Sequence, residues 1–336
     1  MELPVDSPKP FRLLHLPSLA HDVIFSEIST KELYHLSKCS RRSRYAVKMF
    51  TRYRKYDFYI TTAESYGSLI ISHRFWGESF NRQLRALGFT KPVYEDSYIT
   101  YHSEDLWATT KEEIVYLFDV FTKNVTYLNL TDNTKITKMT ELLKENMVLP
   151  VDYVRYHVSV MDDEIYKYVL RKFKDARKLH ISVSPSADFR FDDMDPFTGE
   201  EISIMNADWL TVDNLTRCFM SFERVYLWTF SKRCLNVLVF NQFLNAWRNG
   251  LRIGKLDLEY DCANIDLQSI FTNVPTTEVK RVQLKYCKRV FDDGQFFLIR
   301  QEESGMEAIV YFDYDNVLRN HRLCFTTNFR LLRDDE

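Results

Sequence analysis

Two histidines are the first candidates for chemistry in this chain. His157 and His180 occupy strand-face positions in two neighbouring apolar segments, so they would lie near one another on a sheet. Imidazole nitrogens bind zinc and other transition metals, and a shared metal is one interpretation of the pair. A packed or solvated pair is favoured, because the other histidines are scattered along the sequence. We expect no metal and no cofactor.

An acidic stretch between Asp188 and Glu201 is the second candidate. Closely spaced carboxylates can bind calcium, but the calcium-loop pattern is not met. Counted from Asp193, the fifth position is Phe197, and Gly199 comes one residue too late. We interpret the stretch as a solvated insertion loop, with a docking site for a basic substrate as the alternative.

Catalytic motifs are absent from the sequence. It contains no G-x-G-x-x-G, Walker A loop, H-E-x-x-H or G-x-S-x-G. The six cysteines form no C-x-x-C pair and have no zinc-ligand spacing, so we expect reduced, mostly buried thiols. These cysteines are Cys39, Cys218, Cys234, Cys262, Cys287 and Cys324. The pattern predicts a protein that is not an enzyme.

Charge and composition bound the possible partners. The run from Lys38 to Lys55 contains no acid, and we interpret it as the solvated face of a helix. Nucleic-acid binding is the alternative; it is disfavoured because Tyr45, Phe50 and Tyr53 are better explained as core residues. Over the chain, 45 Lys and Arg nearly cancel 47 Asp and Glu, so no global field favours nucleic acid.

The N-terminus and the hydropathy pattern indicate a compartment. Residues 1–10 lack the charged and apolar regions of a signal peptide and are expected to form a disordered lead. No apolar run approaches the length of a membrane span. We expect a cytoplasmic and/or nuclear protein with no membrane partner.

Residues 11–56 predict three short helices. Pro17 suits the start of the first helix, and Ser29 and Glu32 have the spacing of a capping box at the start of the second. The first helix would carry Leu19, Val23, Ile24 and Ile28 on one stripe. So small a unit has more apolar surface than its own core can bury, so it should bind a partner.

This segment resembles an F-box. The positions that carry the resemblance are Leu14, Leu16, Pro17, Val23, Ile24, Ile28, Leu33, Leu36, Ser37, Ser40, Arg41 and Arg42. The resemblance implies docking on the Skp-like adaptor of a cullin-RING ubiquitin ligase, and through it on a cullin. The Skp-contacting residues it implies are Leu14, Leu16, Pro17, Ile24, Leu33 and Leu36.

A strand signal of the form apolar-x-apolar recurs through the remainder. It begins at Leu128, Val154, Leu179, Val225, Leu256 and Val282, with steps of 26, 25, 46, 31 and 26 residues. The segment Ile202–Ile204 falls where the long step lacks a strand. Helix-period segments alternate with the strands, which predicts an α/β fold: a leucine-rich-repeat-like strand–helix solenoid with a curved, mainly parallel sheet.

The intervening helices are predicted by their apolar faces. One face comprises Ile136, Met139, Leu142 and Leu143; a second comprises Ile165, Tyr168, Val169 and Phe173; a third comprises Phe240, Phe243, Leu244 and Trp247; and a fourth comprises Ile265, Leu267, Ile270 and Phe271. Gly250 is placed as a stop after the third.

Polar and aromatic residues between the apolar strand positions predict that one face of the sheet meets solvent. Most of that face is interpreted as an ordinary solvated surface. Because solenoid sheets present concave faces for recognition, the sharper interpretation is a substrate-binding surface. Its candidate residues are Arg155, His180, Tyr226, Trp228 and Asp257.

A second resemblance concerns three later segments. Residues 207–215, 240–247 and 296–309 are similar to the type 2 F-box-associated domain of the F-box proteins expanded in nematodes. The turn at 302–305 departs from the shorter acidic-Gly turn of many members. The expected organisation is a lead (1–10), an F-box (11–56), a linker of mixed strands with one helix (57–124) and a repeat-like associated domain (125–336).

Together these features predict a substrate-recognition adaptor of an SCF-type ubiquitin ligase. The F-box would bind a Skp-like adaptor and the C-terminal domain a protein substrate. The alternative is an interaction scaffold that binds Skp without recruiting a ligase.

The helix predicted within the linker, residues 57–124, would bury Ile114, Leu117, Phe118 and Phe121.

Overall fold

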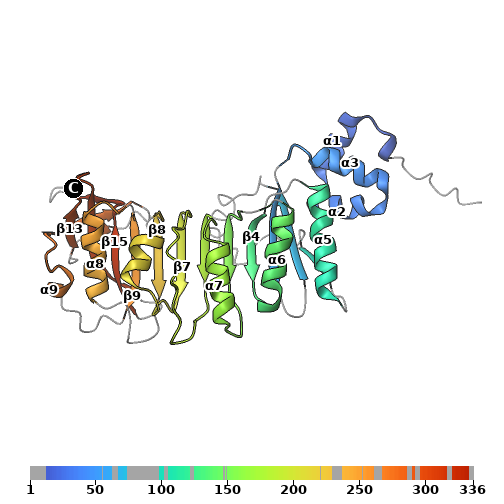
Figure 1. Cartoon of the computed structure of the whole chain (residues 1–336). Helices are drawn as coiled ribbons and strands as arrows, with labels where there is room; N and C mark the ends of the chain where they lie inside the picture. Colours follow the sequence, from blue (N-terminus) through green and yellow to red (C-terminus); the bar gives the residue numbers. More distant parts are fainter. Residues whose placement is uncertain are drawn as a thin grey trace, which may run out of the picture. The chain divides into compact units, whose positions relative to one another are not determined.

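The computed structural model describes residues 13–54, 56–62, 67–73, 98–101, 105–121, 125–146, 148, 150–219, 221–228, 237–251, 253–260, 267–285, 290–291, 296–315 and 320–332. The chain forms two compact units. The first comprises residues 1–127 and 141–149, and the second comprises residues 128–140 and 150–336. Figure 1 gives the element labels used below.

The first unit begins with three short helices, as predicted. They follow a 3-10 turn and are α1, α2 and α3; the bounds are η1 Leu13–His15, α1 Ser18–Glu27, α2 Thr30–Cys39 and α3 Arg41–Thr51. The predicted capping box is present: the Glu32 backbone N–H donates to Ser29 Oγ at 3.2 Å, and the Ser29 N–H donates to the Glu32 carboxylate at 2.7 Å. Phe25 and Phe50 meet edge to face in the core of these helices.

In the described part of the first unit, strands and the helix α5 follow these three helices. The strands β1, β2 and β3 pair antiparallel in sequence order, and α5 follows them; the bounds are β1 Tyr56–Thr62, β2 Gly67–His73, β3 Tyr98–Tyr101 and α5 Leu106–Val120. The helix face predicted from sequence is buried, at Ile114, Leu117, Phe118 and Phe121.

Two elements contribute residues to both units. They are the strand β4 and the helix α6, with bounds β4 Val125–Leu130 and α6 Asn133–Glu145. The α6 face predicted from periodicity is buried, since each of its four apolar residues is at most 3% exposed. These residues are Ile136, Met139, Leu142 and Leu143.

The second unit contains a run of parallel strands in the predicted order. They are β5 Tyr153–Tyr156, β6 Lys178–Ile181, β7 Glu201–Met205, β8 Arg224–Trp228 and β9 Lys255–Tyr260. Each pairs parallel with the next, and β7 is the strand expected near residue 204. Alternate residues such as Val154, Leu179 and Val225 are buried, and they pack toward the helices.

The helices of this unit cover that buried side. They are α7, the π-helical turn η4 and α8, with bounds α7 Asp163–Lys172, η4 Asn214–Cys218 and α8 Val237–Arg248; Figure 1 shows α7 and α8 on the same face of the sheet. The predicted α8 face is fully buried, and Gly250 ends the helix with φ +111°. The predicted α7 face is confirmed at Val169 and Phe173, which are buried. It was wrong at Ile165 and Tyr168, which are partly exposed while Tyr166 and Leu170 are buried.

The acidic stretch differs from its prediction as a solvated loop. Phe189, Phe191 and Phe197 are at most 5% exposed, and the first two pack against the Trp209 indole. The segment therefore supplies core residues between β6 and β7. The preceding pairs of strands, β4–β5 and β5–β6, have a helix in the corresponding place. Gly199 is required there, because a Cβ would lie 2.4 Å from the Ala176 carbonyl oxygen.

The C-terminal strands depart from the parallel pattern. After β9 the sheet continues antiparallel through β15, β14, β13 and β10, with bounds β10 Thr277–Val279, β13 Phe296–Arg300, β14 Glu307–Asp315 and β15 Asn320–Thr326. The short helix α9 Leu267–Ile270 precedes them. Ile270 is buried, as expected for the last predicted helix, whereas Ile265 of that helix lies outside the described residues.

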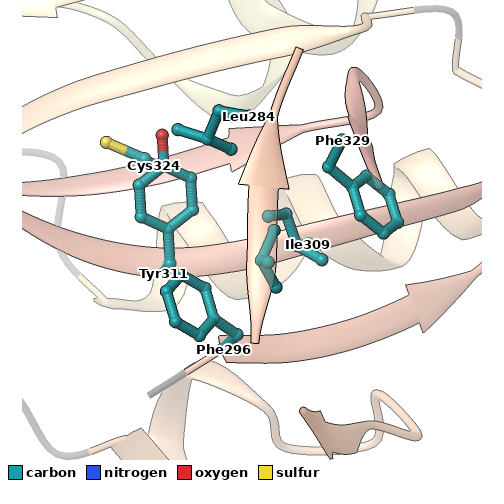
Figure 2. Close-up of a cluster of buried hydrophobic side chains, with 7 residues drawn as sticks. Leu284, Phe296, Ile309, Tyr311, Cys324 and Phe329 are labelled. Atoms are coloured by element: carbon teal, nitrogen blue, oxygen red, sulfur yellow. The ribbon is translucent and has the colours of Figure 1, made fainter. Parts of the chain in front are cut away.

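The strand predicted at 282–284 exists, but its predicted place beside β9 was wrong. It is β11, which pairs antiparallel with β12 and β16 in a separate small sheet; the bounds are β11 Val282–Leu284, β12 Val290–Phe291 and β16 Phe329–Leu331. Figure 2 shows Leu284 and Phe329 clustered with Phe296, Ile309 and Tyr311 of the large sheet. The expected solvent-facing side is therefore covered at this end of the second unit.

Candidate functional site

The first candidate surface lies on the three N-terminal helices. Of the predicted partner-contacting residues, Pro17 is exposed and Leu33 is 2% exposed, so Leu33 supports the surface from beneath. The others are partly exposed: Leu14, Leu16, Ile24 and Leu36. The Arg42 guanidinium donates to the Leu14 carbonyl at 2.9 Å, and this hydrogen bond holds the segment before α1 against α3.

A larger apolar surface adjoins these residues. Leu19 and Val23 on α1 are 78% and 65% exposed. The expectation that Tyr45 and Tyr53 belong to the core was wrong: they are 65% and 84% exposed, and only Phe50 is buried. Tyr45 and Met49 stand four residues apart on one face of α3, and Tyr53 follows four residues later in the turn after the helix. That spacing was the available sequence signal for this surface.

The ridge formed by Tyr45, Met49 and Tyr53 borders a hollow of about 610 Å³, which Leu14 and His21 also line. Exposed apolar side chains on this scale mark a protein-binding surface. The surface is thus broader than the predicted residues alone.

The basic run was expected to be a solvated face, but part of it binds α5. The Lys38 ammonium lies 2.5 Å from the Glu113 carboxylate. Asp119 pairs with both Arg44 and Lys48, at 2.8 and 2.6 Å. The hydrogen bond from Lys48 has the largest effect and lowers the Asp119 pKa; burial opposes it, and the hydrogen bond from Arg44 lowers the pKa further, so that it lies below its usual value. This ionic contact fixes α3 on α5 within the first unit.

The ion pairs predict a small, pH-dependent stabilisation. Because the pKa of Asp119 is lowered in the folded chain, its contribution is present above the carboxyl's unfolded pKa and is lost as pH falls through the lowered value. Asp119→Asn should lower the free energy of unfolding by at most about 1 kcal/mol at neutral pH, since the side chain is partly exposed and screened. Thermal unfolding across pH measures this.

The difference between the Asp119→Asn variant and the wild type should vanish in strong acid and shrink at high salt. The control is Glu303→Gln, because Glu303 is exposed in a turn of the second unit. Asp163→Asn would be unsuitable as a control, because Asp163 accepts hydrogen bonds from Ser186. A difference that persists unchanged at acid pH contradicts the ionic account.

The second candidate surface is the side of β5–β9 opposite the helices. The strand registers bring four of the five predicted substrate-binding residues into one row. In this row Arg155 pairs with His180, His180 with Ser203, Ser203 with Tyr226, and Tyr226 with Asp257. Trp228 lies two residues beyond Tyr226 on β8 and faces the same way. All five predicted residues are partly exposed.

Aromatic and polar contacts organise this surface. The rings of Tyr226 and Trp228 stack, with their centroids 6.1 Å apart and an interplanar angle of 12°. The Trp228 ring also contacts the His180 ring. The His180 Nδ1 and Ser203 Oγ form a hydrogen bond of 2.7 Å. Burial lowers the His180 pKa, and Arg155 and then His157 lower it further. The imidazole is therefore held neutral.

A hollow of about 270 Å³ opens on this surface. Sequence reasoning did not single out four of its lining residues, whose side chains complete the walls at one end of the strands: Tyr153, Lys178, Glu201 and Ser203. Lys255 lies over the Tyr226 ring at 4.8 Å and pairs with Asp257 at 3.0 Å. The predicted site is thus one continuous polar and aromatic surface.

The alternative role for the acidic insertion is weakened by its ion pairs. Asp193 pairs with Arg171 at 3.1 Å, and Asp195 pairs with Lys174 at 2.9 Å. These carboxylates are already matched within the second unit. In the part of the chain that the structure describes, no group of three or more His, Cys, Asp or Glu residues could hold a metal ion. Nor does any described helix have the length and hydropathy to cross a membrane.

Comparison with known families identifies the N-terminal helices. Residues 13–55 match the F-box domain. No curated protein and no solved structure matches the chain. The F-box domain implies binding to a Skp-like adaptor, and thereby a role in an SCF ubiquitin ligase that includes a cullin. F-box proteins are typically adaptors and not enzymes.

Proposed function

We propose that this protein is a substrate-recognition adaptor of an SCF-type ubiquitin ligase. The F-box match at residues 13–55 carries the proposal. The surface formed by η1, α1 and α2 would bind the Skp-like adaptor, using Leu14, Leu16, Pro17, Ile24 and Leu36, with Leu33 as support from beneath. Catalysis would come from other proteins, because the adaptor only raises the local concentration of its substrate near the charged enzyme.

The open surface of β5–β9 is our candidate for substrate binding. Its support is the row of partly exposed residues around the stacked Tyr226 and Trp228, since aromatic residues supply much of the energy of protein interfaces. We infer that residues 125–336 form a type 2 F-box-associated domain with a repeat-like parallel region, and that residues 11–56 and 57–124 are the F-box and a linker. Action in the cytoplasm and/or nucleus is part of the same proposal.

Proteins that co-purify with the full chain, with and without proteasome inhibition, test this function. We expect a Skp-like adaptor and a cullin, together with partners that accumulate when the proteasome is inhibited. A Skp-like adaptor without a cullin would indicate the scaffold alternative. Absence of the Skp-like adaptor would reject both.

A further inference from the structure

The open face of β5–β8, which contains this hollow, carries more cations than anions. Among the ionised open-surface side chains of these strands, three are cations and one is an anion: Arg155, Lys178 and Arg224 against Glu201. Glu201 is shared, at 3.7 Å from Lys178 and 3.2 Å from Arg224. Burial, and then the nearby positive charge, lower the His180 pKa, which favours its neutral form. The described surface therefore carries an excess of positive charge beside an aromatic wall.

Arg155 is the cation of this face that no described residue of the chain matches. Its Nε is buried and has no hydrogen-bond partner among the described residues, and the guanidinium forms no ion pair with any of them. A buried donor without a partner carries a desolvation cost, which a charged acceptor from a ligand would offset. Arg155 pairs in register with His180, whose ring lines the hollow.

We propose that the open face of β5–β8 binds an acidic peptide segment of the substrate, with an anionic side chain pairing with Arg155 next to His180 and the adjoining residues lying in the hollow beside the Tyr226–Trp228 stack. This inference rests on the proposed substrate-binding role of the open surface. The anionic group is a carboxylate or a phosphate, because the guanidinium fork accepts either. The Trp228 indole packs against the neighbouring apolar part of the segment.

A nucleic acid would also offer anions and stacking bases. The surface disfavours it because Glu201 lies between Lys178 and Arg224 and interrupts the row of cations. Nucleic-acid surfaces instead have a continuous basic stripe that follows a phosphate backbone. One acidic side chain placed at Arg155 fits the single unmatched guanidinium of this face better.

Calorimetry with three synthetic peptides tests the inference on the full chain. In the first, glutamate alternates with valine; in the others, phosphoserine or glutamine replaces each glutamate. We expect the glutamate or phosphoserine peptide to bind about tenfold or more tightly than the glutamine peptide, and the preference to weaken with salt. The stronger of the two anionic peptides identifies the source of the anion. Equal binding of the glutamine peptide would overturn the proposal.

Variants of Arg155 separate recognition from folding. Arg155→Gln should remove the preference for the anionic peptides without lowering the melting temperature, since Arg155 makes no hydrogen bond within the described chain. Arg155→Lys should restore most of it. Arg177→Gln is the matched control, because Arg177 is exposed and pairs with Glu200 outside the hollow. Loss of the preference in the control as well would contradict a local site.

An independent readout comes from His180. An anion beside Arg155 offsets one of the charges that lower the His180 pKa, so NMR titration should show that pKa rising when the glutamate peptide binds. Tighter binding of single-stranded oligothymidylate than of either anionic peptide would overturn the proposal in favour of nucleic acid.

Failure of this inference can be told apart from failure of the proposed function. If Trp228→Ala abolishes the capture of cellular partners and Arg155→Gln does not, the acidic-peptide proposal is rejected and the substrate-binding role of the open surface stands. A glutamate preference that depends on Arg155, in a chain that captures no partner through the open surface, would reject the substrate-binding role while retaining the anion site.

Discussion

Replacing Leu16 and Pro17 together by alanine should abolish co-purification with a Skp-like adaptor and leave the second unit folded. Leu16 is partly exposed and Pro17 is exposed at the start of α1, so both lie at the surface that the F-box offers to its partner. We expect a combined loss of about 3 kcal/mol or more, which is roughly a hundredfold or more in affinity.

The fold should tolerate this double change. The Pro17 carbonyl accepts from the backbone N–H groups of Ala20 and His21, and alanine keeps that carbonyl. Leu331→Ala is the control, because Leu331 is 40% exposed on β16, outside the F-box. Circular dichroism and the melting temperature check that the variants are folded. Undiminished adaptor binding by the double variant would reject the assignment of this surface.

Local sequence signals predicted the elements that depend on local contacts. The capping box at Ser29 and the i, i+3, i+4, i+7 spacing of the α8 core both concern residues within two turns of one another. The spacing of the strand signals also predicted the order of the parallel strands β5–β9. Because parallel pairing keeps alternate residues on one face, it placed Arg155, His180 and Tyr226 in one row.

Contacts between distant segments could not be predicted in the same way. Val282 and Leu284 give the same apolar-x-apolar signal as the earlier strands, but their partners on β16 lie more than forty residues further along the chain. The pattern reports that a strand has a buried face and does not report which sheet covers it. For the same reason, the sequence did not show that Lys48 pairs with Asp119, 71 residues away.

The acidic insertion illustrates a conflict between composition and packing. Its carboxylates suggested a solvated loop, but its three phenylalanines are buried and two of them contact Trp209. Phe189 and Phe191 have the two-residue spacing of a strand, but the pair is too short to predict an element, and Phe197 follows only six residues later. The surplus of aromatic residues was the only available indication.

That packing bears directly on Trp228, because an insertion lying over Trp228 would make this residue part of the core. The insertion packs on Trp209 instead, and Tyr166 joins the same cluster on the helix-covered side of the sheet. Trp228 lies on the opposite side, partly exposed and stacked on Tyr226. The structure thus removes the reason to regard Trp228 as a core residue beneath the insertion.

Changing Trp228 to alanine should therefore weaken substrate capture by about 2 kcal/mol or more, roughly thirtyfold in affinity, because a central aromatic anchor carries much of an interface's energy. Binding to the Skp-like adaptor should be unchanged, since the F-box is a separate surface. Trp228→Phe should retain part of the capture, because a phenyl ring can still stack on Tyr226.

Tyr168→Ala removes a partly exposed aromatic from α7 and serves as the control. Pull-down of partners beside thermal unfolding makes the comparison: a large fall in melting temperature, accompanied by lower yield of the adaptor-bound chain, would show that Trp228 stabilises the fold and does not act as a binding anchor.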